Sequence, residues 1–184
     1  MPKHLSRDEL VAGLPEILAS PIDNGALVAI VTRLASEQRV EPRKCNVSVA
    51  GGLDGDRWAD GNRTTDGNGT LHTDDQISIM NARCIALIAQ ERERWALSGN
   101  NLIVDMNLTP ENLPPDQRLS IGSAVIEITR KPHKGCAKFI DRFGREACVF
   151  VNTGEGIRNR LRGVYARVVK GGEIAVGDRV CKLA

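Results

Sequence analysis

The segment 131–139 of the sequence, KPHKGCAKF, combines one cysteine with several basic side chains. Cys136 lies between Lys134 and Lys138, and Lys131 and His133 precede it closely. Positive charge stabilises a thiolate and lowers the pKa of a cysteine from its usual value of about 8.5. Because the thiolate is the reactive form of cysteine, we predict that Cys136 is the catalytic residue and that His133 assists it.

A reactive thiolate can be a nucleophile, a sulfur carrier in persulfide form, or the ligand of a soft metal. The pair His133-x-x-Cys136 resembles half of a zinc site, but no second pair follows at a suitable distance. A nucleophilic dyad needs a histidine folded against the cysteine, and only His72 and His133 are candidates. The residues alone do not choose among these roles, and an unreactive cysteine in a basic loop also fits them.

A second group of cations follows a glycine turn at Gly154-x-Gly156. Arg158, Arg160 and Arg162 come directly after this turn. The pattern matches neither a P-loop nor a dinucleotide fingerprint, but guanidinium groups bind phosphate and carboxylate strongly. We therefore predict that these arginines hold an anionic cofactor together with the cations near Cys136, namely Arg130, Lys131, Lys134 and Lys138.

Length and composition indicate one globular domain. The chain has 184 residues, of which 41% are apolar and only 3% aromatic, so aliphatic side chains must fill the core. Basic and acidic residues nearly cancel, 25 against 23, which does not indicate a nucleic-acid-binding protein. No apolar run reaches the roughly 18 residues of a membrane span, and no secretory signal is recognisable.

Cysteine usage indicates a reducing compartment. The five cysteines form an odd number at wide spacings, which argues against a disulfide framework and for reduced thiols in the cytoplasm. Cys148 follows Cys136 in the same region, and the sequence leaves open whether the two can pair.

Strands of the first half should follow two short helical turns. Ser6 and Glu9 form a capping box, Leu10, Val11 and Leu14 should face inward, and proline 15 should end or kink the helix. Apolar runs then predict strands at 26–32, near 40, at 47–49 and at 76–80. The glycine- and aspartate-rich segment 51–73 reads as a long loop, which Trp58 anchors to the core.

The second half should contain one long helix and many strands. Asn81 is a plausible N-cap for a helix that reaches about Leu97 and ends at Gly99, with an apolar stripe that includes Cys84 and Trp95. The remainder predicts a mostly β structure, with strands at 101–104, 118–121, 124–129, 165–169 and 179–183.

These elements predict a mainly β, α+β fold. We expect a β-barrel of short, mostly antiparallel strands with peripheral helices. Residues 1–24 should form a helical extension and residues 25–183 the barrel core of a single domain.

The sequence resembles the MOSC domain, the module named after the C-terminal part of molybdenum cofactor sulfurases. The resemblance extends over about residues 25–183 and rests on the order of several motifs. These are GLDGDR at 52–57, DQISIMNA at 75–82, GNNL at 99–102, RLSIGSAVIEIT at 118–129 and KPHKGC at 131–136.

The resemblance implies a functional cysteine, which maps onto Cys136. In the family this residue carries sulfur as a persulfide or ligates the molybdenum of a molybdopterin cofactor. The chain has no PLP domain, so sulfur would come from a cysteine desulfurase or pass to a molybdoenzyme.

Two other functions remain open. One is a molybdopterin-dependent reductase of N-hydroxylated compounds, which would need an external electron donor. The other is a non-catalytic domain that binds an anionic ligand or a protein. We do not expect the protein to bind nucleic acid or a membrane.

Overall fold

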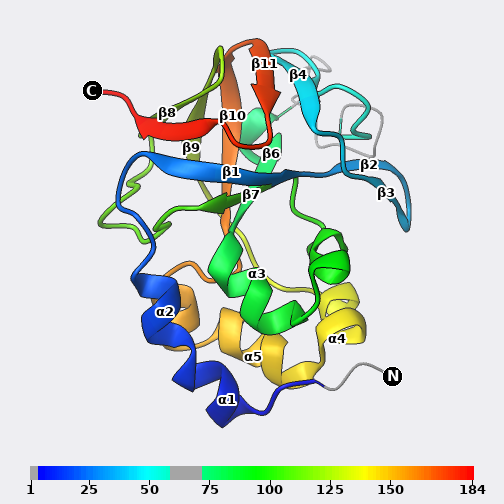
Figure 1. Ribbon diagram of the computed structural model, residues 1–184, viewed down its shortest axis with the longest axis vertical. Coiled ribbons are helices and arrows are strands. Elements are labelled where there is room, and N and C mark those ends of the chain that lie inside the picture. Colours follow the sequence, from blue (N-terminus) through cyan, green and yellow to red (C-terminus); the bar gives the residue numbers. More distant parts are fainter. Residues whose placement is uncertain (1–3, 59–71) are drawn as a thin grey trace.

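The computed structural model describes residues 4–58 and 72–184, and its main feature is a closed β-barrel (Figure 1). The strands follow one another around the barrel in the order β1, β12, β8, β9, β10, β6, β7. All neighbours pair antiparallel except β6 and β7, which run parallel. In chain order the strands are β1 (Gly25–Ile30), β6 (Ile77–Asn81), β7 (Leu102–Asp105), β8 (Arg118–Ile121), β9 (Ala124–Pro132), β10 (Val164–Lys170) and β12 (Arg179–Lys182). The predicted mainly β fold with a barrel of mostly antiparallel strands is confirmed.

Alternation along the strands places aliphatic side chains inside the barrel. On β10, Val164, Ala166 and Val168 are buried, whereas Tyr165 and Arg167 between them are only half-buried. Successive side chains of a strand point to opposite faces of the sheet, so this pattern fills the interior. Burying a valine or isoleucine side chain stabilises the folded state by roughly 1.5–3 kcal/mol. The barrel core therefore needs few aromatic residues.

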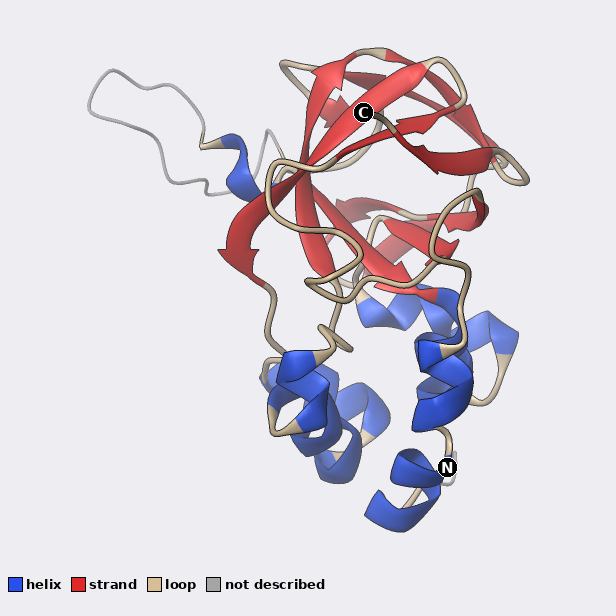
Figure 2. Ribbon diagram, turned by 90° about the vertical axis from the view of Figure 1, so that its left-hand side faces the viewer, coloured by secondary structure: helices blue, strands red, loops and turns tan. Residues whose placement is uncertain are grey.

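Helices form a separate layer at one end of the barrel (Figures 1 and 2). They pack through a second apolar cluster that includes Leu10, Ile85, Phe139, Phe143 and Phe150. The helices are α1 (Arg7–Ala12), α2 (Leu14–Leu18), α3 (Ala82–Ala89), α4 (Ala137–Phe143), α5 (Arg145–Asn152) and α6 (Glu155–Arg158), with 3-10 helices η1 (Thr73–Asp75) and η2 (Arg92–Ser98). Among the described residues, no helix is long and apolar enough to cross a membrane.

Two small sheets flank the barrel. A three-stranded sheet contains β11, β4 and β5, and a hairpin contains β2 and β3. Their bounds are β2 (Thr32–Ala35), β3 (Gln38–Val40), β4 (Lys44–Ser48), β5 (Gly52–Leu53) and β11 (Gly172–Ala175). Residues 59–71, most of the predicted 51–73 loop, lie outside the described residues. Trp58 before this gap is 1% exposed, which confirms its role as a core anchor.

The predicted N-terminal helix is confirmed in its start but not in all of its inner face. The Ser6 hydroxyl and the Glu9 carboxylate form the expected capping box. Leu10 is fully buried, but Val11 is 49% exposed, so its predicted inward position is wrong. The helix ends at Ala12, and Pro15 lies at the start of the next one, as its missing N–H allows.

The single long helix predicted after Asn81 is wrong, because the chain breaks in the middle. Asn81 does cap α3 by accepting a hydrogen bond from the Cys84 backbone N–H. At Gln90 the backbone reaches a φ of 63°, which ends α3 before η2 begins. Gly99 caps η2 in the left-handed conformation, as predicted.

The prediction of a mostly β final third is wrong for residues 137–158, which form α4, α5 and α6. Each is at most eight residues long, and such helices depend on tertiary packing rather than intrinsic propensity. Phe139, Phe143 and Phe150 supply that packing in the second apolar cluster. The five predicted strands around these helices are confirmed.

A buried amide, Asn101, ties the barrel to the segment around Asp56. Its Oδ1 accepts hydrogen bonds from the backbone N–H and the hydroxyl of Ser78, at 3.1 and 2.9 Å. Its Nδ2 donates to the Val31 carbonyl and to the Asp56 carboxylate. Asn101 is fully buried, so all four of these hydrogen bonds are formed away from water and are lost together when the amide is removed.

Replacing Asn101 with alanine should therefore lower the free energy of unfolding by about 2–4 kcal/mol, because several buried polar groups lose their partner. Urea denaturation measures this. Asn46→Ala, at an exposed position of β4, is the matched control and should change stability by less than about 0.5 kcal/mol. Equal stability of the two variants would contradict the role assigned to Asn101.

Candidate functional site

Cys136 lies in the turn that connects the end of β9 to the start of α4, and its side chain is exposed. Its carbonyl accepts the first hydrogen bonds of α4, from the N–H groups of Phe139 and Ile140. The thiol itself caps nothing. The side chain is therefore available for chemistry, in the loop position that the sequence predicted.

Asn152 on α5 holds the loop before Cys136 in place. Its Oδ1 accepts from the Gly135 backbone N–H at 2.8 Å, and its Nδ2 donates to the Gly135 carbonyl at 3.1 Å. A Cβ at position 135 would lie 3.0 Å from Asn152 Nδ2 and 3.1 Å from Cys148 Sγ, so glycine allows this close approach. Cys148 is a buried free thiol and forms no disulfide.

A cleft of about 400 Å³ opens beside Cys136, and we call it the Cys136 cleft. It lies between the β2–β3 hairpin, η2, α4 and the start of β10. Its polar and aromatic lining comprises Arg33, Ser36, Glu37, Arg39, Arg57, Trp58, Ser78, Ser98, His133, Lys134, Cys136, Lys138, Phe139, Arg142, Arg162 and Tyr165. Segments that are far apart in the sequence thus meet around one thiol.

The Cys136 cleft is strongly cationic. Among the described residues Glu37 is the only acidic side chain that lines it, against many arginines and lysines. The Glu37 carboxylate accepts hydrogen bonds from Arg142 at 2.7 Å and Lys138 at 3.2 Å, and lies 3.7 Å from Arg39. Hydrogen bonds from Arg142 and Lys138 lower the pKa of Glu37, so it is ionised at neutral pH.

Arg33 is a cleft residue that the sequence analysis missed. Its Nε and Nη2 donate to the two oxygens of Asp56, at 2.9 and 2.8 Å, in a bidentate pair. Burial alone would raise the pKa of Asp56, but the hydrogen bonds and charge of Arg33 outweigh it and lower that pKa. Asp56 also accepts from Asn101 and from the Trp58 backbone N–H. The Gly-Asp-Arg motif at 55–57 therefore positions Arg33.

Arg162 is 6% exposed, and no carboxylate pairs with it within the described residues. Its Nη1 donates to the Asn100 amide oxygen and its Nη2 to the Ser98 carbonyl, at 2.5 and 2.9 Å. The guanidinium lies 4.9 Å from the centre of the Phe139 ring. Burial lowers the pKa of Arg162 to about 10, so it stays charged at neutral pH. Its Nε has no hydrogen-bond partner.

His133 stacks on Tyr165, with ring centres 4.2 Å apart. Burial lowers its pKa well below the usual 6.5, and the charges of Arg162 and Arg33 add to this effect. At neutral pH the imidazole is therefore uncharged. Its Nδ1 is buried without a partner, and the described residues show no hydrogen bond between His133 and Cys136.

The structure does not bring all the predicted cations together at the Cys136 cleft. Lys134 and Lys138 line the Cys136 cleft together with Arg162. Lys131 and Arg130 point instead to carboxylates of Asp75 and Asp116. In separate positions, Arg158 is exposed and paired with Glu155, and Arg160 lines a second cavity.

The residues missed by sequence analysis are Arg33, Arg39, Arg57, Arg142, Glu37 and Tyr165. Arg57 belongs to the GLDGDR motif, but no local motif marks the other five, because they reach the cleft only through tertiary folding. For example, Lys138 contacts a carboxylate 101 positions earlier in the chain.

Metal binding by protein side chains alone is not supported by the described part of the chain. It contains no group of three or more histidine, cysteine, aspartate or glutamate side chains arranged to hold a metal ion.

Solved structures share this arrangement of barrel and helices. The YUAD protein from Bacillus subtilis is 19% identical with a TM-score of 0.57, over 85% of this chain and 94% of that chain. YiiM from Escherichia coli is 18% identical with a TM-score of 0.55, over 87% of this chain and 70% of that chain. A comparison with curated proteins gave no match.

The fold is thus the one these proteins share. The sequence matches the MOSC domain over residues 63–181, which is more than half of the chain. The protein belongs to the MOSC domain family.

The neutral state of His133 predicts a pH dependence of stability. A histidine whose pKa is lowered in the folded state stabilises the fold fully above about pH 6.5, and this contribution is lost as pH falls below that value. The loss should be at most about 1.4 kcal/mol per pH unit. We expect urea denaturation to show how the free energy of unfolding depends on pH in the wild type and in His133→Phe, which keeps the stacked ring. Above pH 7 the two curves should run parallel, and below about pH 6.5 the free energy of unfolding should fall less steeply in the variant. Identical slopes would contradict this reading.

Glu37 should weaken anion binding to the Cys136 cleft, since it already neutralises part of the cationic lining. We expect Glu37→Gln to bind sulfate several-fold more tightly than the wild type, as measured by isothermal titration calorimetry. Glu41→Gln removes a carboxylate that pairs with Arg92 outside the cleft and is the matched control. An equal effect of both variants would show only a change in net charge.

Proposed function

We propose that this protein handles the molybdenum cofactor, with Cys136 as the thiol that ligates molybdenum or carries sulfur. Membership of the MOSC family gives the general class. The observation that carries the specific proposal is the exposed Cys136 thiol at the edge of a strongly cationic cleft. A cysteine in such surroundings suits a soft metal or a sulfane sulfur.

The residues of the cleft fit an anionic, metal-bearing pterin. Arg162 Nε, Arg39 Nε and His133 Nδ1 are buried polar atoms without partners. Buried donors without partners cost free energy, which a bound anion recovers. When bound, such a cofactor would supply a redox-active metal centre.

Several residues at the cleft have a defined task in this proposal. Cys136 offers its sulfur at the cleft edge, and Asn152 keeps the loop before it in position. Lys134 and Arg162 provide positive charge for the anionic groups of the cofactor. Tyr165, which stacks on His133 and lines the cleft, contributes an aromatic surface, which suits a flat ring system.

The proposed function requires partner proteins that exchange sulfur or electrons with this one. A sulfur-carrying role needs a donor such as a cysteine desulfurase or a recipient molybdoenzyme. A metal-ligand role in a reductase needs an external electron donor. All five cysteines are free thiols, which favours a reducing compartment such as the cytoplasm.

Anaerobic purification from molybdenum-replete cells tests the proposal. In the wild type we expect molybdenum and pterin in the protein, or one added sulfur atom on the Cys136 peptide by mass spectrometry. Either signal should be lost in Cys136→Ser, since no other thiol lines the cleft among the described residues.

Cys181→Ser is the matched control, because Cys181 is half-buried on β12 and does not line the cleft. It should keep the wild-type signal. Retention of metal and pterin with loss of the sulfur adduct in Cys136→Ser would favour the carrier role. No dependence of any signal on Cys136 would disprove the proposal.

A further inference from the structure

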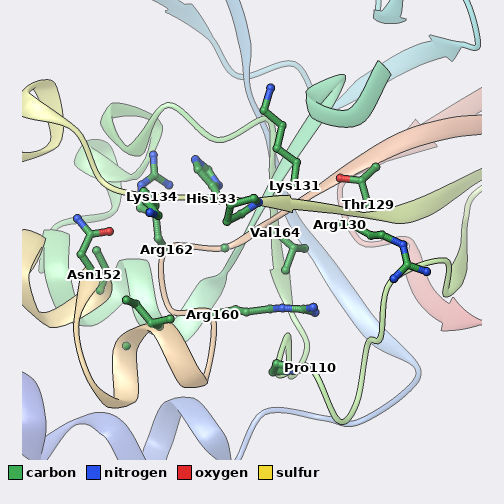
Figure 3. Close-up of a pocket in the computed structure, with 15 residues that line it drawn as sticks. Pro110, Thr129, Arg130, Lys131, His133, Lys134, Asn152, Arg160, Arg162 and Val164 are labelled. Atoms are coloured by element: carbon green, nitrogen blue, oxygen red, sulfur yellow. The ribbon is translucent and has the colours of Figure 1, made fainter. Parts of the chain in front are cut away.

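A second cavity, of about 250 Å³, adjoins the Cys136 cleft (Figure 3). We call it the Arg160 cavity. It is enclosed by the end of β9, the start of β10, and residues of α5 and α6. His133, Lys134 and Arg162 line both spaces, whereas Cys136 lines only the cleft. The three shared side chains therefore form a wall between two neighbouring sites.

The lining of the Arg160 cavity is basic and apolar, and no acidic residue belongs to it within the described chain. Its basic members are Arg130, Lys131, Lys134, Arg160 and Arg162, and its aliphatic members include Pro110, Ile157 and Val164.

Only some of these cations are neutralised. Arg130 pairs with Asp116, and Lys131 pairs with Asp75. The other three basic side chains form no ion pair with any described residue. They are Lys134, Arg160 and Arg162. The cavity therefore carries an excess of positive charge.

Two guanidinium groups have N–H donors left over at this cavity. Arg162 is 6% exposed, and its Nε is buried without a hydrogen-bond partner. Arg160 donates from Nη1 to the Leu113 carbonyl at 2.6 Å, and its other N–H groups have no partner among the described residues. In Figure 3 the Arg160 side chain lies extended between Val164 and Pro110. A cation next to aliphatic groups is thus presented to the cavity.

Desolvation makes this arrangement costly without a ligand. Burial lowers the pKa of Arg160, and the nearby charge of Glu111 opposes that effect only in part. A partly buried cation is stabilised by an anion that forms hydrogen bonds with it. The aliphatic lining would at the same time bury an apolar part of the same ligand.

We propose that the Arg160 cavity binds a small molecule that joins one phosphate or carboxylate group to a short apolar body. The anionic group is held by Arg160, with Lys134 and Arg162 beside it, and the apolar body packs on Pro110 and Ile157. This site goes beyond the proposed cofactor function, since Arg160 and the apolar residues that define it do not line the Cys136 cleft, and it shares with that cleft only the dividing wall that contains Lys134 and Arg162. The protein would then bind a second small molecule in a cavity that adjoins the Cys136 cleft.

Isothermal titration calorimetry of the whole protein tests this proposal with phenyl phosphate, benzoate and inorganic phosphate as probes. We expect phenyl phosphate or benzoate to bind, and the preferred one identifies the anionic group. Arg160→Gln should weaken that binding by roughly 10-fold or more, the usual cost of losing a hydrogen bond to a charged group. Arg158→Gln, an exposed position at the end of α6 outside the cavity, should bind like the wild type.

Two further variants keep the outcome decisive. Arg160→Lys retains the charge without the forked donors and should lie between the wild type and Arg160→Gln, even if the bond to Leu113 contributes to folding. Cys136→Ser should leave the binding unchanged, which separates this site from the proposed cofactor function. No binding to the wild type, equal losses in the position 158 and 160 variants, or equal affinity for inorganic phosphate would each overturn the proposal.

Discussion

Repulsion among cations is the constraint that the Cys136 cleft must overcome. Several guanidinium and ammonium groups converge there with one carboxylate, Glu37, among the described lining residues. Like charges brought together in a partly buried space destabilise the fold unless fixed dipoles or counter-charges compensate them. The scaffold compensates them with backbone carbonyls. Arg142 donates to the Leu97 carbonyl and Arg162 to the Ser98 carbonyl, both at the end of η2.

This arrangement uses a general property of helix ends. The last carbonyls of a helix have no partner within it and carry partial negative charge. The end of η2 thus stabilises two cations with backbone carbonyls, so that Glu37 is the only carboxylate among the described lining residues that could repel an anionic ligand. Asp56 does the same for Arg33 from outside the cleft, since its carboxylate is buried behind the guanidinium.

The barrel strands could be predicted from the sequence because their signal is local. Alternating aliphatic residues mark each strand, and the Asn81 and Gly99 caps mark the helical segment between two of them. Helices α4 to α6 could not be predicted, because they are short and form through contacts of Phe139 and Phe143 with distant residues. The break at Gln90 was missed because its φ of 63° is uncommon for a residue other than glycine, so the sequence does not signal it.

The candidate site was predictable only where its residues are close together in the sequence. Cys136, His133 and Lys134 lie together in one segment, so their chemistry is visible in the sequence. Arg33 and Arg142 join them only after the barrel has closed, and nothing near either residue indicates that position.

The parallel pairing of β6 with β7 has a consequence for how site and scaffold are related. Parallel neighbours cannot be joined by a tight turn, so the chain must cross from one end of the barrel to the other between them. That crossover is the segment with α3 and η2, and it delivers Ser98 and Asn100 to Arg162. The connection that closes the barrel therefore also forms the wall that holds Arg162, the one cationic residue that is buried within ranges 4–58 and 72–184. Transplanting the cleft onto another barrel would require transplanting this crossover as well, so in this architecture the topology and the binding surface are inherited together.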